Sequence, residues 1–577
     1  MNNEHLNHSC SHLLAAAVLE LWPHALPTLG PPIENGFYYD FDFGDTKISD
    51  TDLAQIEAKM HQISPFWKNF EEVIVTPGQA KKDFQNNPYK LELINELTDQ
   101  KITYYKSGDF FDLCRGGHAD LTTQPLNHFK LLSVAGAYWR GSEKNKMLTR
   151  IYGTCWPSQK ELDDYLNHLE EVKKRDHRKL GKLLDLWTFS DLVGSGLPLY
   201  TPKGAFLRKT LNDYVESVQS GQKYYQVWTN QFARAQLFKT SGHYDKYKDS
   251  MFRVASNFTD EEFFLKPMNC PQHTQIYASQ PKSYRDLPIR YTDFAMLYRD
   301  EKPGELTGLS RVRSFSQDDC HVFCTEDQVD TEVDMMLAMT KSIMNTFGFK
   351  YKYRLSTRDP LHPEKYLGDP LTWDKVEKWA VKIMDRNHID YIDGPGEAAF
   401  YAPKMDLIAT DALGREWQLS TVQIDYVMPQ RFSLEYTDRD GLTKTPIMLH
   451  RAIIGSAERF IAIILEHFAG NLPTWLNPVQ VKVLPISDRH LEYSRQVHQK
   501  LLDNQIRSEL DDRNDTLKGK IRDAQLQKAS YMLVLGDKEV QSQTVTERAR
   551  SGKADGPFPI ETFITNIKSE IKEKVNT

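Results

Sequence analysis

The 577-residue chain has few cysteines and no long apolar run, and both shortages exclude classes of protein. Six cysteines are too few for a disulfide scaffold, and their spacing shows no extracellular pattern. The best apolar run, residues 453–465, is interrupted by Glu458 and Arg459 and is shorter than a membrane span. The first ten residues are polar and lack the features of a secretion signal. We therefore expect a cytoplasmic protein with no membrane partner.

An excess of basic charge is also missing from the chain. Its 72 lysines and arginines are outnumbered by 79 aspartates and glutamates, for a net charge of −7. The total charge therefore does not imply long-range attraction to nucleic acid, and any such contact has to be local. Internal repeats and low-complexity tracts are absent too, which excludes solenoid architectures. The 40% hydrophobic content is enough to bury sizeable cores.

The length of the chain and the positions of its proline-rich and breaker-free segments predict several domains. Residues 159–184 have apolar residues at helical spacing and almost no helix breakers, which predicts one long exposed helix joining two domains. The run NLPTWLNP, with two prolines, marks a second boundary. The expected parts are residues 1–157, a linker helix at 158–184, a block at 185–473 and a block at 478–577.

The two C-terminal blocks predict different kinds of sheet. In residues 478–577, short β-branched runs alternate with helical patterns in a βαβαβ order, which predicts an α/β domain with a mostly parallel sheet. The block at 185–473 shows long strand-loop-strand stretches followed late by a strand and an apolar-faced helix. We expect an antiparallel sheet there, carrying a functional site.

Three residues of the central block are candidates for a catalytic metal site: Cys270, His321 and His450. Thiolate and imidazole are the ligands of a borderline cation such as zinc, and catalytic sites use three protein ligands with one open position. A buried cysteine or histidine taken singly is more often part of the core. Their neighbours strengthen the functional interpretation.

Several arginines lie near these candidates. Arg299, Arg311 and Arg313 lie on two predicted strands that flank a Pro-Gly loop, and their planar forks suit carboxylate or phosphate groups. Arg459 lies near the start of a predicted helix, where phosphate binds well. An exposed charged hairpin is the alternative interpretation.

The N-terminal block holds a second cluster. His8 and His12 are four residues apart on an apolar helical pattern and so share a face. Cys114 and His118 are separated by two glycines, which suits a turn. From the residues alone, this set is either a zinc site or two unrelated surface pairs.

These segments together resemble one family. The stretch YRDEKPGELTGLSRVRSFSQDDCH resembles motif 2 of a class II aminoacyl-tRNA synthetase, and HRAIIGSAERFIAIILEHFAG resembles motif 3. The segments KPMNCPQH, FYAPKMD and EWQLSTVQID are similar to threonyl-tRNA synthetases in particular. HSCSHLL and DLCRGGH resemble the editing domain of that family, and DDRNDTLKGKIRDAQL its anticodon-binding domain. Essentially the whole chain is covered by colinear motifs.

The resemblance implies an α+β editing domain, a class II antiparallel catalytic domain and an α/β anticodon-binding domain. It implies ATP-dependent activation of L-threonine, transfer of the threonine to the 3′ end of tRNA(Thr), and hydrolysis of mischarged seryl-tRNA(Thr). It also implies that the protein is a homodimer. Two alternatives stay open: a synthetase-derived tRNA-binding or regulatory protein without ligase activity, and a stand-alone metal hydrolase.

The resemblance also implies roles for individual residues of the catalytic block. One zinc ion per subunit is expected on Cys270, His321 and His450, and Mg²⁺ is expected with ATP. The threonine-binding residues are expected to be Asp319, Gln317, Tyr401, Gln418 and Gln423. The ATP-binding and catalytic residues are expected to be Arg299, Glu301, Arg311, Phe315 and Arg459.

The two outer domains receive roles in the same way. The editing residues are expected to be His8, His12, Lys90, Asp112, Cys114 and His118, and the resemblance implies no metal among them. The anticodon contacts are expected to be Asn514, Arg522, Glu539 and Arg548.

The chain departs from the family pattern at several positions. Asn230 replaces a motif 1 proline associated with the dimer interface. The positions Gln272, Ala402, Ser420 and Ser314 stand where the family has glycine, and an added side chain there can narrow a pocket or forbid a backbone conformation. The chain begins directly at the editing motif, so we expect the small ubiquitin-like domain that commonly precedes it to be absent.

Overall fold

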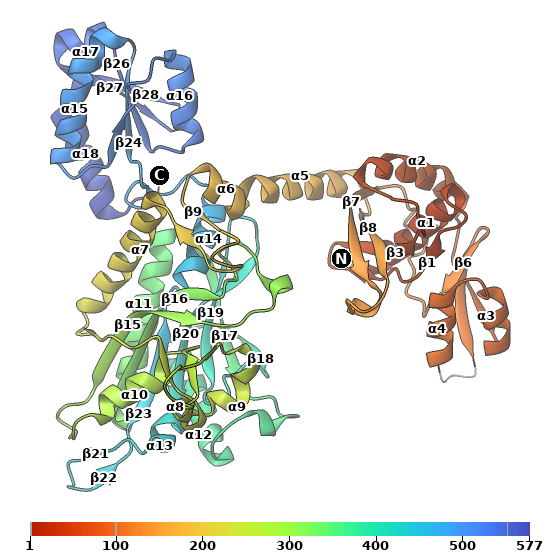
Figure 1. The fold of residues 1–577 in the computed structure, drawn as a ribbon, viewed down its shortest axis with the longest axis horizontal. Coiled ribbons are helices and arrows are strands. Elements are labelled where there is room, and N and C mark those ends of the chain that lie inside the picture. The colour runs from red at the N-terminus through yellow and green to blue at the C-terminus, as the bar shows by residue number, and fades with distance from the viewer. Residues whose placement is uncertain (1–2, 98–100, 551, 577) are drawn as a thin grey trace. The chain divides into compact units, whose positions relative to one another are not determined.

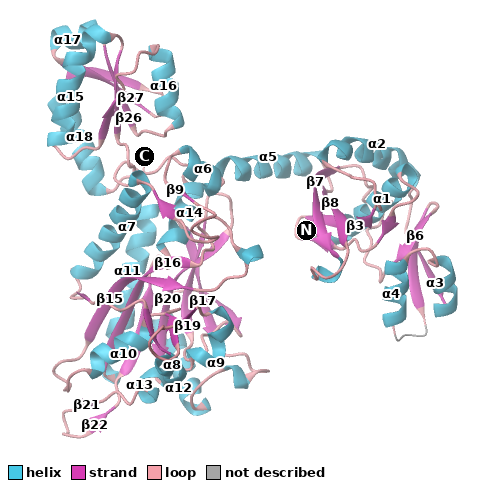
Figure 2. Ribbon diagram, viewed as in Figure 1, coloured by secondary structure: helices cyan, strands magenta, loops and turns pink. Residues whose placement is uncertain are grey.

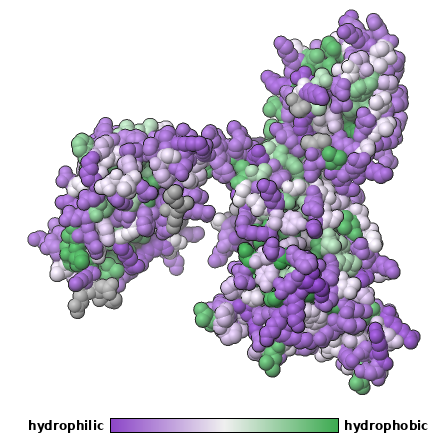
Figure 3. Space-filling view, turned by 180° about the vertical axis from the view of Figure 1, so that it is seen from behind, coloured by the Kyte–Doolittle hydropathy of each residue, from purple (hydrophilic) through white to green (hydrophobic). Residues whose placement is uncertain are grey.

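The computed structural model describes residues 3–97, 101–550 and 552–576, which divide into two compact units, residues 1–170 and 171–577. Both are mixtures of helices and largely antiparallel sheets (Figures 1 and 2). Within the described ranges, every helix is too short or too polar to cross a membrane. On the face shown in Figure 3, hydrophobic residues appear in small groups between hydrophilic ones.

The first unit is built around an antiparallel sheet packed against two helices. The strand order is β1-β3-β8-β7, and β2 pairs with β3. Helix α1 buries an apolar face that includes Leu13, Leu14 and Val18, as its sequence pattern predicts. The elements are α1 (Glu4–Leu21), β1 (Leu26–Pro27), β2 (Pro32–Ile33), β3 (Gly36–Asp42), α2 (Leu53–Ile63), β7 (Phe129–Tyr138) and β8 (Met147–Cys155).

A smaller three-stranded sheet completes the first unit. Its order is β4-β5-β6, all antiparallel, and its elements are β4 (Glu71–Val75), α3 (Pro77–Asp83), α4 (Pro88–Glu96), β5 (Ile102–Ser107) and β6 (Phe110–Leu113). Helices α3 and α4 each start with a proline, after side-chain caps from Thr76 and Asn87, a favourable arrangement for the first helical turn.

The predicted single helix over residues 159–184 is wrong in one respect. The segment forms two helices, α5 (Gln159–Arg175) and α6 (His177–Leu183), which are interrupted at Asp176. Asp176 has a non-helical ψ of 116°, and its side chain accepts a hydrogen bond from the Arg178 backbone. A side-chain cap therefore restarts the helix, and nothing in the local apolar spacing reports this break.

The second unit contains the expected antiparallel sheet. Its eight strands follow the order β11-β15-β16-β23-β20-β19-β17-β18, and only the two outermost pairings are parallel (Figure 1). The strands are β11 (Tyr225–Gln226), β15 (Ile289–Tyr298), β16 (Ser314–Cys324), β17 (Lys350–Thr357), β18 (Tyr391–Pro395), β19 (Lys404–Thr410), β20 (Glu416–Asp425) and β23 (Ile447–Ala452).

Helices cover this sheet, and residues of α7, α11, α12 and α14 share one large apolar core with it. These helices are α7 (Pro202–Ser220), α11 (Val329–Phe347), α12 (Pro370–Arg386) and α14 (Ala457–His467). The smaller elements are β9 (Trp187–Thr188), β10 (Leu199–Tyr200), β12 (Phe232–Arg234), α8 (Ala235–Ser241), α9 (His243–Tyr247), β13 (Arg253–Val254), β14 (Phe263–Leu265), α10 (Cys270–Ala278), α13 (Val427–Arg431), β21 (Tyr436–Thr437) and β22 (Thr443–Lys444).

The C-terminal sheet has the strand order β25-β24-β26-β27-β28. Only β25, β24 and β26 are parallel, whereas β27 and β28 are antiparallel and were not predicted. Their sequences, TVTERA and ADGPFP, are charged or proline-containing and lack a strand pattern. The elements are β24 (Val481–Pro485), α15 (Leu491–Asp503), β25 (Ser508–Leu510), α16 (Leu517–Leu526), β26 (Tyr531–Leu535), α17 (Asp537–Ser542), β27 (Thr544–Ala549), β28 (Ala554–Pro559) and α18 (Ile560–Glu573).

Candidate active site

Strand β16 brings four of the predicted residues onto one face of the central sheet. Phe315, Gln317, Asp319 and His321 alternate along it, and side chains two residues apart point to the same side of a strand. His321 lies directly opposite His450 on β23. The pattern of one strand therefore places the predicted nucleotide, amino-acid and metal residues in a row.

The other face of β16 anchors the segment before α14. The buried carboxylate of Asp318 accepts hydrogen bonds from the backbone N–H groups of Ile453, at 2.7 Å, and Gly455, at 2.9 Å. Burial raises the pKa of Asp318 to about 7. The Ser456 hydroxyl caps α14 by accepting from the Arg459 backbone at 3.2 Å. These bonds set where α14 begins, and so place Arg459 in its first turn.

The ligand atoms of Cys270, His321 and His450 all lie within 4.8 Å of one another. All three residues are buried, and Cys270 is the first residue of α10. His450 Nε2 lies 2.9 Å from Asp425 Oδ2, and His321 Nδ1 lies 2.7 Å from His273 Nδ1. Each imidazole is thus oriented by a contact at one ring nitrogen and keeps the other for a ligand.

The environment of these donors suits a metal ion. Burial, followed by the charges of Asp319 and Asp425, raises the pKa of the Cys270 thiol well above its usual value. Burial, followed by His450 and His273, lowers the pKa of His321 well below its usual value. The His321 imidazole is therefore neutral, as a ligand must be, and a bound cation would favour the Cys270 thiolate. One soft and two borderline donors fit a borderline divalent cation.

The predicted threonine residues divide into two groups. Near the donors, Asp319 Oδ1 lies 3.7 Å from His321 Nε2, and the ring of Tyr401 is centred 5.0 Å from that of His450. Gln423 faces His450 across the β20–β23 pair, and its buried Oε1 has no hydrogen-bond partner among the described residues. An unpaired buried acceptor at such a position is suited to a ligand donor.

Gln418 belongs to a different network. Its Nε2 donates to Asp406 Oδ1 at 2.9 Å, and its Oε1 accepts from Arg354 at 2.9 Å. A β-bulge between Leu407 and Ile408 shifts the register of this part of β20. Both ends of the Gln418 amide are therefore occupied by the protein.

All five predicted ATP residues line one cavity of about 520 Å³: Arg299, Glu301, Arg311, Phe315 and Arg459. The Arg299 guanidinium lies 5.1 Å from the centre of the Phe315 ring, and its Nε is buried without a hydrogen-bond partner among the described residues. An unpaired arginine nitrogen next to an aromatic ring is suited to an anionic, ring-containing ligand.

Two more residues that line this cavity, Trp417 and Glu305, were missed by the sequence analysis. The guanidinium of Arg459 lies 5.5 Å from the centre of the Trp417 ring, and both residues line the cavity. Burial, and then the charge of Arg311, lowers the pKa of Arg459. Arg311 itself pairs with Glu301 at 2.8 Å and with Glu305 at 2.7 Å. Trp417 and Glu305 carry no local signal, because a strand aromatic and a loop carboxylate are common in any protein.

The departures from the family pattern have definite places in the fold. The Gln272 side chain donates to the backbone oxygen of Asn230 at 3.0 Å, so two of the departures contact each other. Ser420 donates to the Ala452 backbone at 2.8 Å and lies 3.2 Å from the Thr340 hydroxyl. Ala402 is completely buried. Ser420 therefore contacts α11 through Thr340.

The N-terminal cluster also converges in space. The ligand atoms of His8, His12, Cys114 and His118 lie within 4.8 Å of one another, next to a cavity of about 720 Å³. Gly116 has a positive φ of 93°, so the segment between Cys114 and His118 is the predicted turn. Burial, followed by His12 and His8, lowers the pKa of His118 to about 2. The geometry alone would suit a metal, although the family resemblance implies none.

Two more predicted residues meet in the same cavity. Lys90 Nζ lies 2.5 Å from Asp112 Oδ1, and Lys90 is only 1% exposed. The Tyr39 hydroxyl donates to the other Asp112 oxygen and lies 3.4 Å from Lys90 Nζ. Tyr39 was missed because a tyrosine in the strand GFYYDFD reads as core. Burial, and then Asp112, raises its pKa well above the usual value.

The predicted anticodon residues lie on separate elements of the C-terminal domain. Asn514 and Arg522 are exposed, and Arg548 is on β27 with a buried, unpartnered Nε among the described residues. Glu539 is engaged within the protein, because its two carboxylate oxygens accept from the Gly536 backbone and the Thr546 hydroxyl. Glu539 therefore caps α17.

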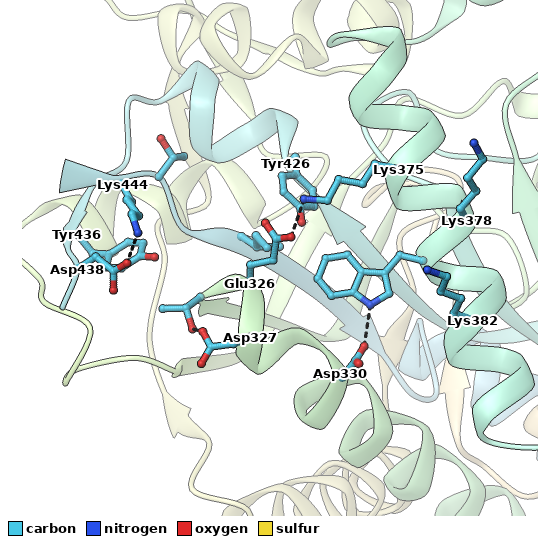
Figure 4. Close-up of a pocket in the computed structure, with 14 residues that line it drawn as sticks. Glu326, Asp327, Asp330, Lys375, Lys378, Lys382, Tyr426, Tyr436, Asp438 and Lys444 are labelled. Atoms are coloured by element: carbon cyan, nitrogen blue, oxygen red, sulfur yellow. Dashed lines mark hydrogen bonds and ion pairs between the residues drawn. The ribbon is translucent and has the colours of Figure 1, made fainter. Parts of the chain in front are cut away.

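A larger cavity, of about 880 Å³, contains none of the predicted residues (Figure 4). Its charges are mostly matched internally: Lys375 pairs with Glu326, Lys444 with Asp438, and Trp379 donates to Asp330. Lys378 points away from the acidic side (Figure 4). With its charges balanced in this way, the cavity favours no ligand class.

Comparisons with known proteins agree with the geometry. Residues 102–152 match the threonyl and alanyl tRNA synthetase second additional domain, residues 252–468 the tRNA synthetase class II core domain (G, H, P, S and T), and residues 480–570 an anticodon binding domain. The chain is 47% identical over 569 residues to a threonine–tRNA ligase of Rubrobacter xylanophilus, covering 98% of this chain and 88% of that protein. It is 44% identical over 573 residues to one of Thermotoga neapolitana, covering 99% and 88%.

Solved structures give the same result. The RNA binding domain of threonyl-tRNA synthetase from Cryptosporidium parvum matches with a TM-score of 0.65 and 38% identity, over 68% of this chain and 98% of that one. A putative threonyl-tRNA synthetase from Aeropyrum pernix matches with a TM-score of 0.61 and 26% identity, over 70% and 96%.

Proposed function

The chain belongs to the threonyl-tRNA synthetase family, and from that membership we propose how its sites divide the work of a threonine–tRNA ligase. The class II core activates L-threonine with ATP and transfers it to tRNA(Thr), and the N-terminal domain supports editing of mischarged tRNA. The observation that carries the residue assignments is the single face of β16, which presents Phe315, Asp319 and His321 side by side.

Selection of threonine is assigned to the buried donor set. Cys270, His321 and His450 would hold a zinc ion, which when bound supplies a ligand position that a β-hydroxyl can occupy and a methyl group cannot. Valine has the size of threonine, so packing alone discriminates poorly against it. A site that binds a hydroxyl can instead discriminate by about 10⁴-fold against an amino acid that lacks one. Asp319, Tyr401 and the unpaired Gln423 oxygen would orient the amino acid.

Adenylation is assigned to the 520 Å³ cavity. Arg299 would bridge the threonine carboxylate and the ATP α-phosphate, Phe315 would stack on adenine, and Arg311 and Arg459 would hold the distal phosphates. Mg²⁺ would enter with ATP. Catalysis of this kind depends on placing the carboxylate in line with the phosphate and stabilising the negative charge that develops. Gln418 has a supporting role, since Arg354 and Asp406 occupy its amide.

The remaining roles follow the family. The cavity around His8, Lys90 and Asp112 would receive the mischarged 3′ end and position water, with Tyr39 added to the predicted set. Asn514, Arg522 and Arg548 would contact the anticodon, whereas Glu539 would act through α17. We also propose that the protein acts as a homodimer in the cytoplasm.

The decisive assay is ATP–pyrophosphate exchange with purified, zinc-replete protein. We expect exchange that depends on threonine, weaker exchange with serine, and little with valine. Absence of threonine-dependent exchange would favour the non-catalytic regulatory protein. Exchange without a preference for threonine over valine would contradict the hydroxyl-selective site.

Replacing His8 by asparagine should separate the two activities. His8 lies beside Cys114 and lines the N-terminal cavity, so we expect deacylation of seryl-tRNA(Thr) to fall by about 100-fold, the lower range for a lost acid–base group. Threonylation should stay within about twofold because the cores are separate. His24→Asn, which replaces an exposed histidine outside that cavity, is the matched control. Unchanged deacylation in His8→Asn would refute the assigned role.

A further inference from the structure

His177, the first residue of α6, connects two segments that wall the ATP cavity. Its side chain is buried, with 5% of its surface exposed. Its Nδ1 lies 2.6 Å from Glu466 Oε1 near the end of α14, and its Nε2 lies 3.2 Å from the backbone nitrogen of Leu309. Leu309 belongs to the loop between β15 and β16, which carries Arg311.

The chemistry of these contacts fixes the state of the ring. The Leu309 nitrogen can only donate, so Nε2 accepts, and Nδ1 must carry the proton that it donates to Glu466. Asp176, His177 and Glu466 lie close enough together to resemble a metal site. Both ring nitrogens are nevertheless occupied by protein partners, so His177 has no lone pair left for a cation. The ring is a hydrogen-bond bridge.

The Glu466 side leads to the Arg459 wall of the cavity. Glu466 also pairs with Arg415, whose guanidinium lies 5.2 Å from the centre of the Trp417 ring. Arg459 lies 5.5 Å from the same ring. Burial would raise the pKa of Glu466, but the hydrogen bonds from His177 and Arg415 outweigh it and lower that pKa. An ionised Glu466 thus holds Arg415 against Trp417.

The Leu309 side leads to Arg299 and Arg311, which also line the cavity. Leu309 is completely buried, and a Cβ added at the neighbouring Gly308 would lie 2.2 Å from His177 Nε2. The loop is therefore seated directly against the imidazole. Arg299 and Arg311 lie at the two ends of this loop, and both line the cavity.

We propose that His177 is a positioning residue for adenylation: its imidazole holds the loop of Arg311 and the helix of Arg459 at a fixed separation around ATP. The proposal rests on the ATP assignments given above. The proposal also explains the helix break at Asp176. A continuous helix from 159 to 184 would lack the capped turn that places the His177 ring against Glu466.

Two amide variants separate the two ends of the bridge. In His177→Gln, the amide oxygen can take the place of Nε2 and accept from Leu309, whereas in His177→Asn the amide nitrogen can take the place of Nδ1 and donate to Glu466. We expect the KM for ATP in threonine-dependent exchange to rise about tenfold in His177→Asn and in His177→Ala, since each leaves the loop N–H unpaired. In His177→Gln it should stay within about threefold of the wild type. The KM for threonine should change less than twofold in all three.

The measurement includes melting temperature and seryl-tRNA deacylation, which report folding independently of ATP. His168→Asn, an exposed histidine on α5, is the matched control. If His177→Asn and His177→Gln behave alike, or if both KM values rise together with a fall in melting temperature, His177 is only a packing residue and the proposal is wrong. Wild-type protein without exchange would instead overturn the proposed function itself.

Discussion

Replacing Cys270 by serine is expected to remove bound zinc and to lower threonine-dependent exchange by well over 100-fold. Loss of an outer contact to a metal ligand typically costs 10- to 100-fold in affinity or activity, and loss of a direct ligand costs more. Serine keeps the size of the side chain but is a poor ligand for a cation that selects thiolate and imidazole. Metal analysis and exchange on the same preparation test both expectations.

Cys324 provides the control for this experiment. It is also completely buried and lies on β16, three residues beyond His321, but it is outside the donor cluster. Cys324→Ala should keep its metal and its exchange activity. Full exchange by metal-free Cys270→Ser would show that the donor assignment is wrong, and loss of metal in both variants would indicate a general folding defect.

Replacing Arg299 by lysine is expected to lower kcat/KM for exchange by about 10³-fold, the cost of one lost donor to a developing negative charge. Lysine keeps the charge but loses the planar fork that can bind carboxylate and phosphate together. The loss should appear mainly in kcat, because the bridging contacts strengthen as the carboxylate reaches the phosphate. The buried Nε of Arg299 has no hydrogen-bond partner among the described residues, so the change takes no hydrogen bond of that nitrogen from the fold.

The exposed Arg285, just before β15, is the matched position for the same substitution. Arg285→Lys should leave kcat and both KM values within about twofold. If Arg299→Lys also leaves kcat and both KM values within about twofold, another group bridges the threonine carboxylate and the ATP α-phosphate. If only the KM for ATP rises, Arg299 binds the ground state and does not favour the transition state.

Local sequence was enough for features that depend on near neighbours. The alternation along SFSQDDCH predicts which side chains of β16 share a face, and the spacing of His8 and His12 predicts a shared helical face. The βαβαβ pattern predicted three strands and three helices of the C-terminal domain. It missed β27 and β28, because β27 is held by pairing with β26 and β28 by pairing with β27, and neither segment has a strand signal of its own.

The family resemblance supplied what local patterns could not. It named Cys270, His321 and His450 as one set before any geometry was known, and it selected five of the residues that line the ATP cavity. It did not indicate that Gln418 and Glu539 are engaged within the protein, nor that Tyr39 and Trp417 belong to the sites. Such details depend on which partner each side chain finds.

By itself, the sequence determined the class of each domain, the periodicity of the strands that it predicted and the chemical types available at each site, since these depend on residues close together along the chain. The tertiary structure alone decided that a thiol and two imidazoles meet, that a helix stops at Asp176, and that His177 bridges Leu309 and Glu466. The physical reason is that strand pairing and helix packing set distances between remote residues, and separation along a polypeptide carries no information about those distances.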